Sequence, residues 1–185
     1  MATTTVSRNT LDRFYAAIRD VPDFPKPGIL FRDITPLLMD APLFRRAVRA
    51  MSRPFELRQV DRVLAVESRG FIFGAPIALA LKAALVPARK PGKLPWKRHR
   101  VEYELEYGTD AIEIHEDAIQ RGDRVLVVDD VLATGGTASA AVRAVEQGGG
   151  TLVGLTFLIE LAALNGRRRL GRARVASLLT YPRGP

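Results

Sequence analysis

The amino-acid sequence predicts an α/β fold in which a mostly parallel, twisted sheet is flanked by helices. Two observations lead to this class. Short apolar runs of strand length alternate along the chain with segments whose apolar residues recur at helical spacing, as in parallel sheets with right-handed crossovers. The most apolar run, at 125–128, leads directly into two acidic residues and a glycine-containing turn. The length of 185 residues fits a single domain, 1–185.

The first fifty residues predict two helices separated by an ordered loop. Apolar residues recur at helical spacing over 11–18, and Asn9 or Thr10 is expected to cap this first helix. The segment 23–36 is rich in proline and glycine but also apolar, which indicates an ordered loop rather than a linker. Asp40 stands two residues before a proline and predicts the start of the second helix, because proline is tolerated in a first turn.

The rest of the chain alternates between strands and helices. We expect, in order, a strand at 62–67, a helix at 70–83, strands at 84–89 and 124–130, a helix at 136–148, and strands at 151–161 and 174–181. The stretch "VEYELEY" (101–107) alternates with period two, and "AIEIH" (111–115) follows it across a short turn. These two stretches predict a β-hairpin outside the main sheet, which can cover a site at the sheet edge.

Composition excludes several kinds of site. The chain has no cysteine, so disulfides and thiolate metal sites are excluded, and this fits a reducing cytoplasm. The polar N-terminus lacks the apolar core of a signal peptide. The longest apolar run, 71–88, is interrupted by glycine, proline and lysine, so no membrane partner is expected. His99 and His115 lack the neighbours typical of a metal site or a catalytic triad.

The formal net charge of +8 indicates an anionic partner, either a polyphosphate or a nucleic acid. Basic residues cluster at 88–100 and at 165–175. The second cluster has no interleaved aromatic residues and no nucleic-acid motif, so it predicts a solvated turn and helix end. A nucleic-acid partner is therefore not expected.

The stretch "VLVVDDVLATGGT" (125–137) carries the clearest chemical signal. It places Asp129 and Asp130 at the carboxyl end of a buried strand, where open α/β sheets bind ligands. The turn that follows suits one phosphate, because backbone N–H groups at a helix N-terminus bind anions and glycine allows a close approach. Its residues are Ala133, Thr134, Gly135, Gly136 and Thr137. Carboxylates accept hydrogen bonds from hydroxyls, so a ribose 5-phosphate satisfies both halves of the motif.

Two further segments offer groups for a second anion. In "ESRG", Ser68 and Arg69 follow a buried strand and reach the same sheet edge. In "ARKPGKLP", Arg89, Lys90 and Lys93 stand on a loop bounded by proline and glycine. Three cations there can neutralise a leaving group whose charge grows in the transition state.

The motif at 125–137 resembles the 5-phosphoribosyl-1-pyrophosphate signature of the type I phosphoribosyltransferases. Other segments are similar to adenine phosphoribosyltransferases, and the likeness runs in order along nearly the whole chain after residue 10. These segments are "DFPKPGILFRDITPLL" (23–38), "ESRGFIFGAPIALAL" (67–81), "RKPGKLP" (89–95), "EYELEYGTDAIEI" (102–114) and "LIELAALNGRRRL" (158–170).

The resemblance implies the type I phosphoribosyltransferase fold, with an N-terminal hood segment and a flexible hairpin over the site. It implies purine salvage, in which adenine and phosphoribosyl pyrophosphate give AMP and pyrophosphate. It also implies Mg²⁺ held mainly by the substrate pyrophosphate, without a dedicated protein metal site, and a cytoplasmic homodimer.

The resemblance also suggests roles for individual residues. Glu106 would handle a proton on the purine, and Tyr107 would close over the ribose phosphate. Arg69, Lys93 and Ser68 would hold pyrophosphate, and Arg89 would reach the site of the partner subunit. The purine pocket would use the backbone of Leu30 and Arg32 and the side chains of Phe31 and Leu161.

Two alternatives stay open at this point. One is a regulator that binds phosphoribosyl pyrophosphate without turnover, although the short stretch before the first helix leaves no room for a winged-helix domain. The other is transfer to a 6-oxopurine or to orotate instead of adenine. An assay with each base separates them.

Overall fold

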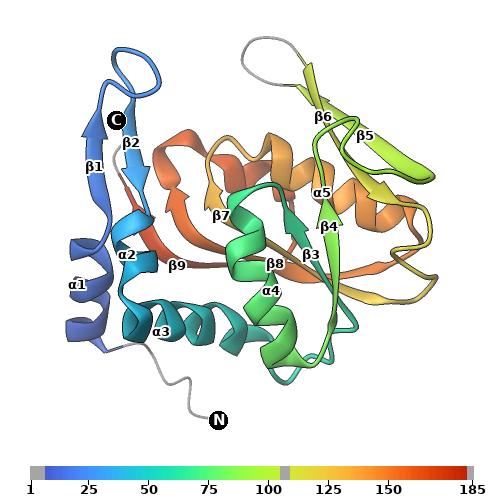
Figure 1. The fold of residues 1–185 in the computed structure, drawn as a ribbon, viewed down its shortest axis with the longest axis horizontal. Coiled ribbons are helices and arrows are strands. Elements are labelled where there is room, and N and C mark those ends of the chain that lie inside the picture. Colours follow the sequence, from blue (N-terminus) through green and yellow to red (C-terminus); the bar gives the residue numbers. More distant parts are fainter. Residues whose placement is uncertain (1–6, 105–108, 183–185) are drawn as a thin grey trace.

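The computed structural model describes residues 7–104 and 109–182 and contains a five-stranded parallel sheet (Figure 1). The strand order is β4-β3-β7-β8-β9, and all neighbouring strands run parallel. The strands are β3 (Arg62–Val66), β4 (Ala84–Ala88), β7 (Arg124–Leu132), β8 (Thr151–Leu161) and β9 (Val175–Tyr181). The predicted α/β class with a mostly parallel sheet is confirmed.

Helices cover both faces of the sheet and form two apolar cores. Four helices share one core with one face of the sheet: α1 (Arg8–Ala16), α2 (Thr35–Met39), α3 (Ala41–Ser52) and α4 (Arg69–Leu81). The other core contains α5 (Gly136–Gln147) and the antiparallel hairpin of β5 (Arg98–Glu104) and β6 (Thr109–His115). Along β7, Val125 and Val127 belong to the α5 core and Leu126 and Val128 to the other. A strand buried on both faces explains the uninterrupted apolar run.

The N-terminal region differs from the prediction at two points. Ser7 caps α1 by accepting a hydrogen bond from the N–H of Thr10, so neither Asn9 nor Thr10 is the cap. The segment 23–36 was predicted to be a loop, but it contains β2 (Leu30–Asp33), which pairs antiparallel with β1 (Arg19–Pro22). The two strands have four residues each and lie on either side of a segment rich in proline and glycine, so the local pattern did not reveal them. We call residues 19–33 the hood.

Other boundaries follow the sequence closely. Asp40 caps α3, as expected, by accepting a 2.9 Å hydrogen bond from the N–H of Leu43. The hairpin begins at Arg98, so part of the basic stretch 96–100 is strand. None of the helices in the described part of the chain is long and apolar enough to cross a membrane.

The second basic cluster is structured differently from the prediction. It follows the 3₁₀ turn η2 (Ala162–Leu164) and forms the 3₁₀ turn η3 (Gly166–Leu170), where we expected a solvated turn and helix end. Gly166 and Leu170 are buried, and Arg167 pairs with Glu160 of β8. The predicted solvated turn is present, since Arg167, Arg168 and Arg169 are exposed, but it is a 3₁₀ turn rather than a helix end. The pairing of Arg167 with Glu160 was not visible in the local sequence.

Replacing Gly74 with alanine should destabilise the fold, although alanine favours helix by about 1 kcal/mol. A Cβ at Gly74 would lie 2.4 Å from the Cβ of Ala65, a fully buried residue of β3. Overpacking of this kind costs about 1–3 kcal/mol, so we expect the free energy of unfolding to fall by about 1–2 kcal/mol. Urea denaturation followed by circular dichroism measures it.

Ala80→Gly on the exposed side of the same helix is the matched control. It should cost about 1 kcal/mol through helix propensity alone. If propensity governed both sites, the two substitutions would change stability in opposite directions, and the close packing of α4 on β3 would be contradicted.

Candidate active site

A pair of carboxylates lies near the carboxyl end of β7. Asp130 is 4% exposed, and its N–H donates a 2.8 Å hydrogen bond to Oδ1 of Asp129. Gly70 lets α4 approach this pair, because a Cβ there would lie 3.0 Å from Oδ1 of Asp129. Burial raises the pKa of Asp129 well above its ordinary value, and the charge of Asp130 raises it further. Burial likewise raises the pKa of Asp130, although Arg69 opposes the rise.

Arg69, the first residue of α4, connects three of the predicted subsites. Its Nε lies 2.7 Å from Oδ2 of Asp130, and its guanidinium carbon lies 5.2 Å from the ring centroid of Phe31 in the hood. Oδ2 of Asp130 has no well-aligned hydrogen bond within the described chain. The acid pair, the "ESRG" turn and the hood therefore converge on one guanidinium group.

The predicted phosphate loop, 133–137, leads into α5. Gly135 is the N-cap residue with φ +82°, and no side chain caps the helix, so its first N–H groups are available to an anion. The hydroxyl of Thr137 lies 3.2 Å from the hydroxyl of Tyr103 on the hairpin. Ala133 and Thr134 are partly buried. All five predicted residues lie together at the strand–helix junction.

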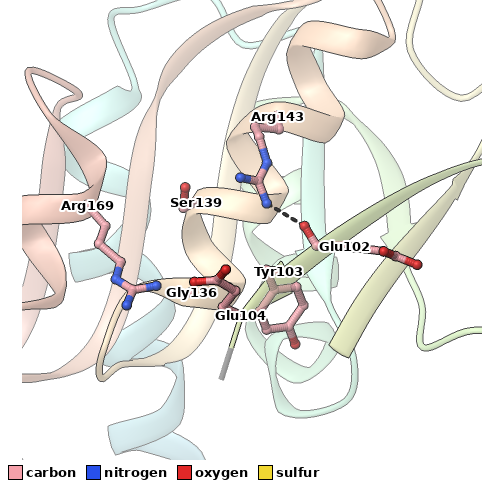
Figure 2. Close-up of a pocket in the computed structure, with 7 residues that line it drawn as sticks. All are labelled: Glu102, Tyr103, Glu104, Gly136, Ser139, Arg143 and Arg169. Atoms are coloured by element: carbon pink, nitrogen blue, oxygen red, sulfur yellow. Dashed lines mark hydrogen bonds between the residues drawn. The ribbon is translucent and has the colours of Figure 1, made fainter. Parts of the chain in front are cut away.

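A cavity of about 390 Å³ lies beside this loop. Figure 2 shows the residues that line it. Its lining comes from β5, from the first turns of α5 and from η3: Glu102, Tyr103, Glu104, Gly136, Ser139, Arg143 and Arg169. Arg143 donates a 2.6 Å hydrogen bond to the carbonyl of Glu102. Only Gly136 among these residues was predicted to contact substrate. Sequence reasoning missed Arg143 and Arg169 because helix and turn arginines usually face solvent.

The three cations predicted to bind pyrophosphate differ in whether an acidic side chain already pairs with them. Nε of Arg89 donates a 3.0 Å hydrogen bond to Glu67, and Nζ of Lys90 contacts Asp110 and lies 3.0 Å from the hydroxyl of Tyr103. Lys93 is exposed and has no side-chain hydrogen bond or ion pair within residues 7–104 and 109–182. Two of the three positive charges thus already have acidic partners in the same chain.

The pKa values agree with this distribution of charge. Burial alone would raise the pKa of Glu67, but hydrogen bonds from the Lys90 N–H and from Arg89 lower it below its ordinary value. Burial alone would lower the pKa of Lys90, but Asp110 and Tyr103 raise it. Both groups are therefore charged at neutral pH.

The hood holds the predicted purine-binding residues. Phe31 packs edge-on against Phe24, with ring centroids 5.1 Å apart. The side chain of Arg32 pairs with Asp20 and stacks 4.1 Å above the ring of Tyr181. This side chain is therefore engaged within the chain, and the backbone of β2 pairs with β1. Leu161 is partly buried at the end of β8 and pairs in register with Tyr181.

The hairpin supports only part of its prediction. The buried side chains of Val101 and Tyr103 alternate with exposed Glu102 and Glu104, as the period-two pattern indicated. Glu106 and Tyr107 lie outside the described residues, as does the rest of 105–108.

Ser68 is exposed at the start of α4. Apart from Glu106 and Tyr107, the predicted site residues lie near the carboxyl edge of the sheet or on the hood and loops beside it.

Comparison with known proteins gives a consistent result. Residues 39–176 match the family model described as phosphoribosyl transferase domain. An adenine phosphoribosyltransferase of Myxococcus xanthus is 62% identical over 166 residues, which cover 90% of each chain. A crystal structure of the enzyme from Rhodothermus marinus is 51% identical, covers 95% of this chain and 100% of its own, and superposes with a TM-score of 0.91.

A third similar protein was solved with ligands. The adenine phosphoribosyltransferase of Saccharomyces cerevisiae, complexed with D-2,5-dideoxy-2,5-imino-altritol 1,6-bisphosphate and adenine, is 40% identical to this chain. The match covers 94% of this chain and 100% of the yeast chain, with a TM-score of 0.88.

Replacing Asp129 with asparagine should stabilise the ligand-free protein at pH 7. Because the folded pKa is raised, the folded state loses stability as pH rises from the ordinary value of 3.8 towards the folded value. Asparagine removes this penalty, so we expect a gain on the order of 1 kcal/mol at pH 7 and almost none at pH 3. Urea denaturation at both pH values measures it.

Asp61→Asn is a control of opposite sign. Hydrogen bonds from Arg124 lower the pKa of Asp61 to about 2, so its carboxylate stabilises the fold above pH 3.8 and this contribution is lost as pH falls through 2. Asp61→Asn should therefore destabilise the protein at pH 7. A loss of stability with Asp129→Asn would show that the acid pair is not strained.

Proposed function

The chain belongs to the adenine phosphoribosyltransferase family, and we propose that it transfers the phosphoribosyl group of phosphoribosyl pyrophosphate to adenine, as in purine salvage. In this reaction the bond from ribose C1 to the pyrophosphate oxygen breaks, and a bond from C1 to the purine imidazole nitrogen forms. The nitrogen loses its proton, and AMP and pyrophosphate leave.

One observation carries the proposal. Arg69 lies 2.7 Å from Asp130, which suits ribose hydroxyls, and 5.2 Å from Phe31, which suits a purine ring. A ribose bound at the acid pair would thus have the base on its hood side and the departing group beside the "ESRG" turn. The relative from Saccharomyces cerevisiae, whose structure contains adenine and a bisphosphate, supports the same division into base and phosphate subsites.

Each group of site residues has a separate role in the proposed reaction. Asp129 and Asp130 accept hydrogen bonds from the two ribose hydroxyls while C1 becomes cationic. The N–H groups of 133–137 hold the 5-phosphate at the N-terminus of α5, where the helix dipole favours an anion. Ser68, Arg69 and the exposed Lys93 receive the growing charge of pyrophosphate. In our proposal Glu106 takes the purine proton and Tyr107 closes over the ribose phosphate.

We propose that Mg²⁺ accompanies the substrate, where it would neutralise pyrophosphate charge. Carboxylate oxygens are ligands that Mg²⁺ accepts, and the buried Oδ2 of Asp130 lacks a well-aligned hydrogen bond within the described chain. No group of three or more acidic or histidine side chains that could hold a metal is found in the residues described. In our proposal the pyrophosphate supplies most of the ligands and the protein few.

Selection of adenine would rest on the hood backbone. In our proposal the main-chain groups of Leu30 and Arg32 read the purine edge, while the side chain of Arg32 is held by Asp20 and Tyr181. A 6-oxopurine reverses the donor and acceptor pattern and would leave buried groups unpaired, which commonly costs of order 10⁴-fold in specificity.

The reaction would take place in the cytoplasm, which the absence of cysteine fits.

The activity is tested by measuring pyrophosphate release from phosphoribosyl pyrophosphate with adenine, hypoxanthine, guanine or orotate. We expect turnover with adenine, little with the other bases, and loss of turnover when EDTA removes Mg²⁺. Lys93→Ala should lower kcat/KM by about 10²–10³-fold, because it removes a cation from the leaving group. Lys97→Ala, an exposed lysine of the same loop, should change it less than about twofold.

The outcomes separate the alternatives. Turnover only with hypoxanthine, guanine or orotate would keep the chemistry and reject the purine pocket at the hood. Binding of phosphoribosyl pyrophosphate without turnover would identify a regulator. Equal effects of the two lysine substitutions would reject Lys93 as a pyrophosphate ligand.

We also propose that the protein is a homodimer in which Arg89 reaches the partner's site. The surface of α4 and the edge strand β4 exposes Ile72 (38%), Leu79 (81%) and Leu85 (41%). Leu85 lies beside α4, since its Cδ1 would be 3.7 Å from a Cβ at Gly74. Arg89 follows directly after β4, so a partner on this surface would lie close to it.

Leu79→Glu should weaken this dimer and lower activity at low protein concentration, because a buried unpaired charge opposes association. Sedimentation velocity measures the mass, and the adenine assay measures the activity of the same samples. Leu57→Glu, at a side chain that is 92% exposed, is the control and should change neither. A Leu79→Glu protein that remains fully dimeric would place the interface elsewhere.

A further inference from the structure

The backbone of η3 packs directly against the backbone of the phosphate loop, 133–137. A Cβ at Gly166 would lie 2.1 Å from the carbonyl oxygen of Ala133 and 2.8 Å from the nitrogen of Gly135. A Cβ at Gly135 would in turn lie 2.4 Å from the carbonyl oxygen of Gly166. The two segments are therefore in direct main-chain contact, and any shift of η3 is transmitted to the loop.

An ion pair fixes η3 in this position. Nε of Arg167 donates to Oε1 of Glu160 at 2.8 Å, and its Nη2 donates to Oε2 at 2.5 Å. The hydroxyl of Ser177 on β9 donates to Oε2 at 2.7 Å, and Nη1 of Arg167 donates to the carbonyl of Val175 at 3.0 Å. This paired, two-point geometry is the most directional ion pair that side chains form. It ties η3 to both β8 and β9.

The acidic residue of this ion pair, Glu160, lies beside the start of the phosphate loop. Glu160 is 6% exposed and pairs in register with Leu132, the residue before Ala133. The hydrogen bonds from Arg167 lower the pKa of Glu160 despite its burial, so the carboxylate stays ionised at neutral pH. A buried carboxylate needs such a partner, and removing Arg167 would leave its charge uncompensated.

We propose that Glu160 and Arg167 are positioning residues for the 5-phosphate loop, acting through the main-chain contact of Gly166 with Ala133 and Gly135. Neither residue needs to touch the ligand. The inference rests on the proposed function, because it assumes that 133–137 hold the phosphate. It assigns a purpose to the second basic cluster, which carries no nucleic-acid motif.

The same turn also places Arg169. This residue follows Arg167 by two positions and lines the cavity that contains Gly136 and Ser139 (Figure 2). The ion pair that fixes η3 thus holds two features in place. One is the backbone that packs against the phosphate loop, and the other is Arg169 beside the first turn of α5. Anion binding by backbone N–H groups depends on their placement, and an error of about 1 Å can cost 10²-fold.

The test compares two ligands on the full chain by calorimetry. Ribose 5-phosphate reports on the loop, and pyrophosphate reports on the separate subsite at Ser68 and Arg69. Arg167→Met and Glu160→Gln should each raise the Kd of ribose 5-phosphate about 10- to 100-fold and leave that of pyrophosphate within about twofold. The double variant should be no worse than the more affected single variant, because both substitutions remove one interaction.

Arg168→Met is the matched control, since it removes the same charge from an exposed neighbour whose side chain forms no hydrogen bond or ion pair with the described residues. It should leave both Kd values unchanged. Ser177→Ala removes one hydrogen bond to Glu160 and should raise the Kd of ribose 5-phosphate about twofold to tenfold. This milder variant gives an answer even where Arg167→Met does not fold.

Three outcomes would overturn the inference. One is an unchanged Kd for ribose 5-phosphate in Arg167→Met or Ser177→Ala. Another is an equal rise for both ligands, which would indicate a general loss of structure. The third is a wild-type protein that binds no ribose 5-phosphate, which would remove the premise that 133–137 hold the phosphate, whereas the proposed function itself is overturned only if the wild type shows no turnover with adenine. A wild-type protein active with adenine whose variants bind normally would reject this inference alone.

Discussion

The contact between Arg69 and Asp130 is the interaction around which the site is organised. A carboxylate that is 4% exposed beside a second acidic residue is unfavourable in an empty protein, because burial and mutual repulsion both disfavour ionisation. Arg69 offsets part of this cost from 2.7 Å away. In the proposed reaction, the hydroxyl groups of a ribose would donate hydrogen bonds to these carboxylates and offset more of this cost.

The parallel sheet is what makes this contact possible. Its strands deliver their carboxyl ends to one edge, so β3 leads to Ser68 and Arg69 while the adjacent β7 carries the acid pair. Glycine then lets neighbouring backbones approach where a Cβ would not fit, at Gly70 beside Asp129 and at Gly135 beside Gly166. Residues far apart in the chain thus meet because of strand order rather than local sequence.

Sequence alone predicted those parts of the fold whose signal is local. The apolar run 125–128 requires a strand buried on both faces, and the structure contains one. The hood strand β2 was missed because it and its partner β1 have only four residues each, too few to show a period-two pattern, and the segment between them is rich in proline and glycine. The pairing of Arg167 with Glu160 was missed for a similar reason, since strand and turn meet only after the chain reverses.

The same limit applied to the predicted site. The motif 125–137 and the "ESRG" turn lie where strand order puts them, but a run of cations says nothing about which already have partners. Glu67 and Asp110 neutralise Arg89 and Lys90, so the loop is held to the hairpin and to the start of α4 by its own charges. Lys93 remains exposed on that anchored loop. A cation on an anchored loop loses less conformational freedom on meeting an anion. In the proposed reaction, the paired residues would therefore contribute by placing Lys93 rather than by binding pyrophosphate within this chain.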